Sequence, residues 1–80
     1  MFTVYILVSV PEPTRHYTGI TKLTAEERLA YHNARKVPHT AKWAPWRLET
    51  YVVFRDEAKA RAFERYLKSG SGREFARRHF

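Results

Sequence analysis

The sequence predicts an α+β fold in which helices cover a three-stranded antiparallel sheet. Two runs rich in β-branched and aromatic residues open the chain and are separated by Pro11 and Pro13, which cannot continue a central strand. Capping patterns at Thr24 and Asp56 each precede a stretch with helical periodicity. One further alternating run lies between them. The expected order is therefore strand, strand, helix, strand, helix and a short C-terminal helix.

The composition indicates one small folded domain over residues 1–80. A chain of this length buries only about 60% of its unfolded surface, so its core must be thin. The hydrophobic share of 44% is still sufficient for a folded protein. There is no cysteine, which excludes disulfides and thiolate zinc sites and suits a reducing compartment.

The formal charge of +7, from 15 basic and 8 acidic residues, favours a polyanionic partner. Nucleic acid is the first expectation, and an anionic membrane surface is the alternative. The apolar run over residues 1–10 has no leading Lys or Arg and is too short for a span of about 20 residues. We therefore expect a strand there, no membrane partner and a soluble cytoplasmic protein, as a monomer or weak homo-oligomer.

The first two strands are expected over residues 2–10 and 16–20, joined as a hairpin. If Leu7 lies opposite Tyr17, then Tyr5 and Tyr17 share one face of the sheet. A slip of one residue would put the two tyrosines on opposite faces.

The first helix begins with a capping box, in which Thr24 is the N-cap and Glu27 reaches back to it. We expect this helix to end at about Asn33 or Arg35. Its apolar residues are few: Ala25, Leu29 and Tyr31. So narrow a stripe predicts a helix that lies over the sheet with much of its surface exposed.

Residues 36–45 show no clear period and are expected to be irregular, and residues 46–54 form the third strand. One face of this strand should carry Leu48, Val52 and Phe54, and the other Tyr51 and Val53. Trp43 and Trp46 are expected to anchor the long loop in the core, with stacking on bases as the alternative.

Asp56 caps the second helix. Its expected apolar stripe consists of Ala58, Ala62, Phe63, Tyr66 and Leu67. Gly70 fits the C-cap of this helix. The pattern from Ser71 to Glu74 reads as a second capping box, which opens a basic final helix to about Arg78.

Four features follow one another on these elements in a fixed order. They are Val4-Tyr5-Ile6 on the first strand, Tyr17-Thr18-Gly19 on the second, Arg28-Leu29-x-x-His32-Asn33 on the first helix, and Glu64 on the second helix, followed by the string from Leu67 to Phe75. This set resembles the GIY-YIG nuclease superfamily, in particular its small single-domain bacterial members and the N-terminal domain of the excision-repair incision subunit. Val4 stands in place of the first Gly and Thr18 in place of the second Ile, and both suit a strand.

The resemblance implies a metal-dependent endonuclease that hydrolyses phosphodiester bonds of nucleic acid, with DNA favoured and RNA as the alternative, in DNA repair or recombination. Tyr5 and Tyr17 would line the cleft in which water attacks phosphorus. A phenol with a pKa near 10 is a poor base unless nearby cations lower that value. The Arg28 guanidinium would hold the scissile phosphate, and His32 would bond a phosphate oxygen or tune a tyrosine.

Glu64 is the implied metal ligand. Mg²⁺, or Mn²⁺ in its place, takes one or two protein carboxylates and completes its shell with water and phosphate oxygen. The alternative is an ordinary surface ion pair with Arg61 or Lys68. The four histidines show no HxxxH or HxH spacing, so a zinc site is not expected.

The C-terminal part of the chain is cationic and suits contacts with a phosphate backbone. The residues concerned are Lys68, Arg73, Arg77 and Arg78. The alternative is a solvated tail. Many catalytic members carry an Asn after the metal-binding Glu, and here Ser69 and Ser71 stand in that region. A catalytically weak nucleic-acid-binding module of the same fold is therefore the second interpretation, and a basic protein-interaction domain the third.

Overall fold

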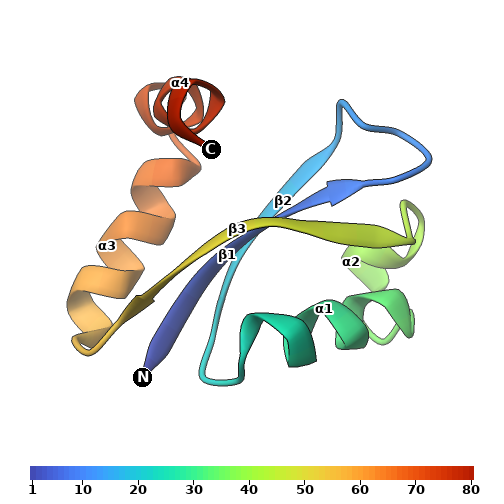
Figure 1. The fold of residues 1–80 in the computed structure, drawn as a ribbon, viewed down its shortest axis with the longest axis horizontal. Coiled ribbons are helices and arrows are strands. Elements are labelled where there is room, and N and C mark those ends of the chain that lie inside the picture. Colours follow the sequence, from blue (N-terminus) through green and yellow to red (C-terminus); the bar gives the residue numbers. More distant parts are fainter.

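The computed structural model describes residues 1–80 and confirms the α+β architecture (Figure 1). Its elements are β1 (Phe2–Ser9), β2 (His16–Thr21), α1 (Ala25–Asn33), α2 (Pro38–Ala41), β3 (Trp46–Phe54), α3 (Glu57–Leu67) and α4 (Gly70–His79). The strands lie in the order β2-β1-β3, and both pairs are antiparallel. No helix has both the length and the apolar character that crossing a membrane requires.

The central strand β1 is buried on both of its faces. Val4 and Ile6 belong to a core cluster that includes Ala60 and Leu67 of α3. Tyr5 and Leu7 point to the other face and pack in a cluster with Ala44 and Trp46. Figure 1 shows the same division, with α3 and α4 on one side of the twisted sheet and α1 and α2 on the other. The thin core is therefore two small clusters separated by β1.

Of the two registers considered for the first hairpin, the structure has the one with Leu7 opposite Tyr17. Leu7 pairs with Tyr17, and Tyr5 pairs with Gly19. Cross-strand partners share a face of a sheet, so Tyr5 and Tyr17 lie on the face that α1 and α2 cover.

A bulge in β3 changes which of its side chains share a face. Ile6 of β1 pairs with Thr50, but the next residue, Leu7, pairs with Leu48. The unpaired residue between them shifts the alternation by one position. Leu48 therefore packs beside Tyr5 and Leu7, while Phe54 packs on the α3 side. The sequence-based assignment of Leu48 and Phe54 to one face is wrong.

The capping box of α1 is confirmed. Thr24 Oγ1 accepts a hydrogen bond from the Glu27 backbone N–H at 3.1 Å, and Glu27 Oε1 accepts from the Thr24 N–H at 3.0 Å. At the other end, the Asn33 side-chain amide bonds the backbone of Trp46 in both directions, at 2.6 and 2.9 Å. These two bonds tie the end of α1 to the start of β3.

The segment 36–45 is not irregular throughout, because it contains the short helix α2. Pro38 occupies its first turn, a position that needs no backbone N–H. Trp46 follows and is 4% exposed, and its indole N–H donates to the Thr40 carbonyl at 2.9 Å. Trp46 is therefore a core anchor, as expected, and it fixes α2 against the sheet.

The sheet-facing row of α3 differs from the predicted stripe. Asp56 is confirmed as N-cap. Ala58, Ala62 and Tyr66 are exposed, so their assignment to the stripe is wrong. The residues at least partly buried are Ala60, Phe63, Glu64 and Leu67. Their spacing of three, four and seven is that of one helix face, and it places a carboxylate among the residues that cover the sheet.

The final helix is longer than predicted and begins earlier. Gly70 is not a C-cap, because α3 ends at Leu67 and α4 begins at Gly70. The Ser69 hydroxyl accepts from the Gly72 N–H at 3.1 Å, which makes Ser69 the N-cap of α4. The predicted capping box at Ser71 is therefore wrong, and α4 continues to His79.

Candidate active site

The Tyr5 hydroxyl is the centre of a buried hydrogen-bond network. It lies 2.9 Å from His32 Nε2 and accepts a hydrogen bond from Arg28 Nε–H at 3.2 Å. Arg28 and His32 are four residues apart on α1 and so project from the same helix face. The Tyr5 ring reaches them by crossing β2 at Gly19, where a side chain would collide with it. Three residues predicted from the sequence are thereby in direct contact.

Tyr17 completes the group from β2. Its ring centroid lies 5.0 Å from that of His32 and 6.2 Å from that of Tyr5. The Tyr17 hydroxyl has no hydrogen-bond partner within the protein. Every buried polar side-chain atom of the protein does have a partner, so the Tyr17 hydroxyl is not one of the buried atoms. It is therefore open to solvent, whereas Tyr5 is only 1% exposed. Tyr17 is the tyrosine that an incoming molecule would meet first.

Burial sets the protonation states of the network. Burial, with the nearby Arg28 charge as the smaller cause, lowers the pKa of His32 to about 4. The imidazole is therefore neutral at pH 7. Burial also raises the pKa of Tyr5 above 10, against the smaller lowering effect of its hydrogen bond from Arg28. The expected lowering by cations is outweighed, and Tyr5 keeps its proton.

His32 has a second partner that sequence reasoning missed. Its Nδ1 lies 2.8 Å from Thr40 Oγ1, and both residues are fully buried. Thr40 belongs to α2, in the segment expected to be irregular, so no periodic signal marked it. Both ring nitrogens of His32 are therefore satisfied within the protein.

Arg28 keeps most of its donors free. Its Nε–H is used by Tyr5, and no protein acceptor faces its two Nη groups. The guanidinium carbon lies 5.2 Å from the centre of the Tyr31 ring, which supports the side chain by a cation–π contact. A guanidinium held in this way presents a planar fork suited to phosphate oxygens.

Glu64 occupies the sheet-facing row of α3 and is 17% exposed at its side chain. All other acidic residues of the chain are exposed. Its carboxylate forms an ion pair with Lys68 at 3.1 Å, which is one of the two surface ion pairs that the sequence offered as the alternative to metal binding. Its negative charge makes the smallest of the contributions to the pKa of Tyr5, and its only side-chain hydrogen bond is the one from Lys68, so no direct contact joins Glu64 to the Tyr5 network.

The donor set fits Mg²⁺ or Mn²⁺ rather than a closed metal cage. The structure has no cluster of three or more His, Cys, Asp or Glu side chains. A single, partly buried carboxylate is nevertheless what a hard cation needs when water and a substrate phosphate supply the remaining ligands. Glu64 would then be the one protein ligand.

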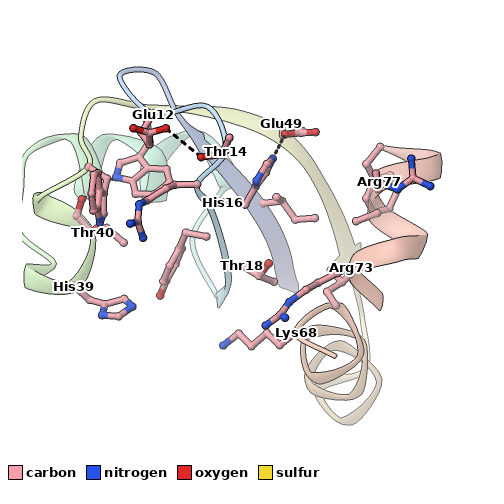
Figure 2. A pocket seen from close by; sticks show the side chains of 18 residues that line it. Glu12, Thr14, His16, Thr18, His39, Thr40, Glu49, Lys68, Arg73 and Arg77 are labelled. Carbon is pink, nitrogen blue, oxygen red and sulfur yellow. Dashed lines mark hydrogen bonds and ion pairs between the residues drawn. The ribbon is translucent and has the colours of Figure 1, made fainter. Parts of the chain in front are cut away.

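A groove of about 1060 Å³ runs along the open edge of β2, with Tyr17 and Thr18 in its floor. Figure 2 shows Lys68 and Arg73 reaching into it from the side of α3 and α4, while His39 faces them from the opposite side. The basic residues that line it are Arg15, His16, His39, Lys68, Arg73 and Arg77.

The groove divides the predicted basic residues. Lys68, Arg73 and Arg77 line it, but Arg78 does not. Arg77 and Arg78 both bind Glu74, and these contacts lower the pKa of Glu74 to about 2. Arg15 and His39 also line the groove, and sequence reasoning missed them because each is an isolated basic residue in a connecting segment or short helix.

Comparison with known proteins gives one result. No curated protein and no solved structure matches the chain. The family model of the GIY-YIG catalytic domain matches residues 1–78, almost the whole chain. That family consists of nuclease domains, whose substrate is nucleic acid. The sheet with its two tyrosine strands, and the extent of the match, show that this chain belongs to the GIY-YIG family.

Proposed function

We propose that the protein is a metal-dependent endonuclease that hydrolyses phosphodiester bonds of nucleic acid, with DNA preferred over RNA and a role in DNA repair or recombination. One observation carries the proposal. Tyr5, Arg28 and His32 form a connected network beside Tyr17, and Tyr17 lines a groove to which several basic side chains also contribute. A binding surface alone would not require this arrangement of buried polar groups.

The groove accounts for substrate binding. Arg73 and Lys68 on one side, with Arg15 on the other, supply positive charge along the open edge of β2. Contacts of this kind go to phosphate oxygens and fix the position of the nucleic acid without reading its sequence. The backbone would then pass over the Tyr17 hydroxyl.

Arg28 acts on the phosphate that is cut. Its free Nη groups bind the non-bridging oxygens, and its Nε–H stays on Tyr5, which fixes the plane of the guanidinium. Negative charge grows on these oxygens as water attacks phosphorus. A preorganised cation at this position stabilises that charge more than it stabilises the ground state.

The two tyrosines have different tasks. Tyr17 presents a free hydroxyl to the groove, where it accepts a hydrogen bond from the attacking water and orients it toward phosphorus. Tyr5 is buried and protonated, so it holds Arg28 and His32 in place. As the water oxygen bonds to phosphorus, the bond from phosphorus to the leaving oxygen breaks. The water gives up one proton to solvent in the groove, and the leaving oxygen takes up one proton from solvent.

Glu64 would hold Mg²⁺ or Mn²⁺, which supplies Lewis-acid stabilisation of the phosphate and the leaving oxygen. On binding the metal, the Glu64 carboxylate would lose its ion pair with Lys68, and the Lys68 ammonium would be free to contact phosphate. Because Glu64 packs in a row of α3 that faces the sheet, its position is fixed by the fold rather than by the metal.

A cleavage assay tests the proposal. Nicked, branched and linear DNA, and structured RNA, are incubated with the protein in the presence of Mg²⁺, Mn²⁺ or a chelator. We expect strand scission that requires the metal and is faster on DNA. Tight binding without scission under every condition would refute the endonuclease and support the binding module.

A further inference from the structure

Thr40 lies at the end of the polar chain that begins at Tyr5. Its Oγ1 is 2.8 Å from His32 Nδ1, and the same hydroxyl donates to the Val37 carbonyl at 3.3 Å. A carbonyl oxygen can only accept a hydrogen bond. The Thr40 hydroxyl can therefore donate its proton to Val37 and use its oxygen to accept from His32.

This direction determines which ring nitrogen of His32 carries the proton. In a neutral imidazole one nitrogen donates and the other accepts. If Nδ1–H donates to Thr40, then Nε2 accepts, and the Tyr5 hydroxyl must be its donor. The Tyr5 oxygen is then free to accept from Arg28 Nε–H. In this arrangement every polar group in the hydrogen-bonded series from Arg28 to Thr40 has a partner.

The other tautomer would leave the chain unsatisfied. Nε2–H and Arg28 Nε–H would both donate to the Tyr5 oxygen, and the hydroxyl proton of Tyr5 would have no acceptor. An unpaired polar hydrogen in a buried site costs free energy. Arg28 would have to move away to relieve the excess of donors, and its alignment with a phosphate would be lost.

The fold holds Thr40 in the required place. Its carbonyl accepts from the Trp46 indole N–H at 2.9 Å. The backbone N–H and carbonyl of Trp46 both hydrogen-bond to the side-chain amide of Asn33, which follows His32 in α1. His32, Thr40, Trp46 and Asn33 thus form a closed ring of contacts that joins α1, α2 and β3.

We infer that Thr40 is a positioning residue for catalysis: it fixes the tautomer of His32 with the proton on Nδ1, so that Tyr5 donates to His32 and accepts from Arg28. Thr40 touches no reacting atom and acts through His32. Its effect on cleavage rests on the proposed nuclease function, whereas its effect on the tautomer does not.

The tautomer can be measured directly in the wild-type protein. A protonated and an unprotonated imidazole nitrogen differ strongly in ¹⁵N chemical shift, and two-bond correlations assign each to Nδ1 or Nε2. The expected result is a single neutral tautomer of His32 with Nδ1 protonated. A wild-type spectrum with the proton on Nε2 would overturn the inference without any variant.

Two variants separate this role from simple packing. Thr40→Val keeps the shape and removes the hydroxyl, and Thr40→Ser keeps the hydroxyl and removes a methyl group. We expect Thr40→Val to lose the pure Nδ1–H tautomer and to reduce kcat by about tenfold or more, because a buried hydrogen bond is lost. Thr40→Ser should retain the tautomer and most of the rate.

The outcomes are distinguishable. Thermal melting shows whether each variant folds, and the wild-type spectrum remains decisive if Thr40→Val does not. A folded Thr40→Val with an unchanged tautomer overturns the inference. If the wild-type protein cuts nothing, the proposed function fails, but the His32 spectrum still tests Thr40.

Discussion

The Tyr5 ring fills the space in which a side chain of Gly19 would stand. A Cβ built on Gly19 would lie 2.5 Å from Tyr5 Cζ and 3.0 Å from Tyr17 Cε2. Tyr5 and Gly19 are cross-strand partners, so the position of the Tyr5 ring over Gly19 follows from the hairpin register. The glycine is the opening through which the Tyr5 hydroxyl reaches α1.

Gly19→Ala should therefore disrupt the site from within. The added methyl group forces the Tyr5 ring to move, and overpacking of this kind costs about 1–3 kcal/mol. We expect a lower urea midpoint and a large loss of cleavage. Gly70→Ala is the matched control, because a Cβ at that position meets nothing within 4 Å. Equal stability of the two variants would show that the ring does not depend on Gly19.

Glu64→Gln should remove metal-dependent cleavage and leave folding and nucleic-acid affinity nearly intact, because the amide keeps the shape but binds a hard cation poorly. Glu57→Gln is its control on the same helix. Glu57 is exposed and pairs with Arg61 at 2.8 Å, four residues away, as Glu64 pairs with Lys68. Single-turnover rates across a Mg²⁺ titration provide the measurement. Wild-type rates for Glu64→Gln would exclude it as the metal ligand.

The salt dependence of binding should distinguish the groove from the rest of the basic surface. Each phosphate contact on duplex DNA contributes about 0.9 to the slope of log K against log salt. Arg73→Gln and Arg15→Gln should each flatten that slope by about one contact, since both residues line the groove. Arg78→Gln should change it little, because Arg78 lies outside the groove and binds Glu74. An equal change in all three variants would mean that the nucleic acid does not follow the groove.

Stability should fall as the pH is lowered from 6.5 to about 4. Over this range the unfolded chain binds a proton at His32, whose ordinary pKa is 6.5, and the folded protein does not, because its pKa is about 4. The difference corresponds to about 3 kcal/mol at most. Above pH 6.5 this group contributes no pH dependence. Urea unfolding of His32→Gln should show a flatter dependence in the same window, and an unchanged dependence would assign the effect to other groups.

The sequence predicted the three strands and the succession of strands and helices along the chain, because β-branched runs, prolines and capping boxes are local signals. The bulge in β3 was not predicted, because one unpaired residue does not change the apolar pattern of a run in which Leu48, Val52 and Phe54 are all apolar. Its consequence is large, since a shift of one position moves a side chain to the other face.

Other errors have equally specific causes. Gly70 fits a C-cap, but the Ser69 hydroxyl captures the Gly72 N–H and starts a new helix instead. Ala58, Ala60 and Ala62 alternate along α3, so alanine alone does not identify the packed face. Only tertiary packing determines that Ala60 is the alanine that faces the sheet, and therefore that Glu64, four residues later, faces it too.

The candidate site was predictable as a set of residues but not as a network. The order of motifs indicated Tyr5, Tyr17, Arg28 and His32, and the structure brings them together. Thr40 and Arg15 were not predictable, because their positions depend on α2 and on the hairpin loop. Neither segment carries a periodic signal.

If the network at Tyr5 is a nuclease active site, cleavage depends on the Arg28 guanidinium. The measurement is the single-turnover cleavage rate of wild-type protein, Arg28→Ala and Arg28→Lys at saturating DNA and Mg²⁺, with folding checked by thermal melting. Loss of a preorganised charge on the phosphate should slow Arg28→Ala by about 10²-fold or more. Arg28→Lys should recover little, because an ammonium cannot hold Tyr5 and two phosphate oxygens together. Cleavage by folded Arg28→Ala at the wild-type rate would contradict the account.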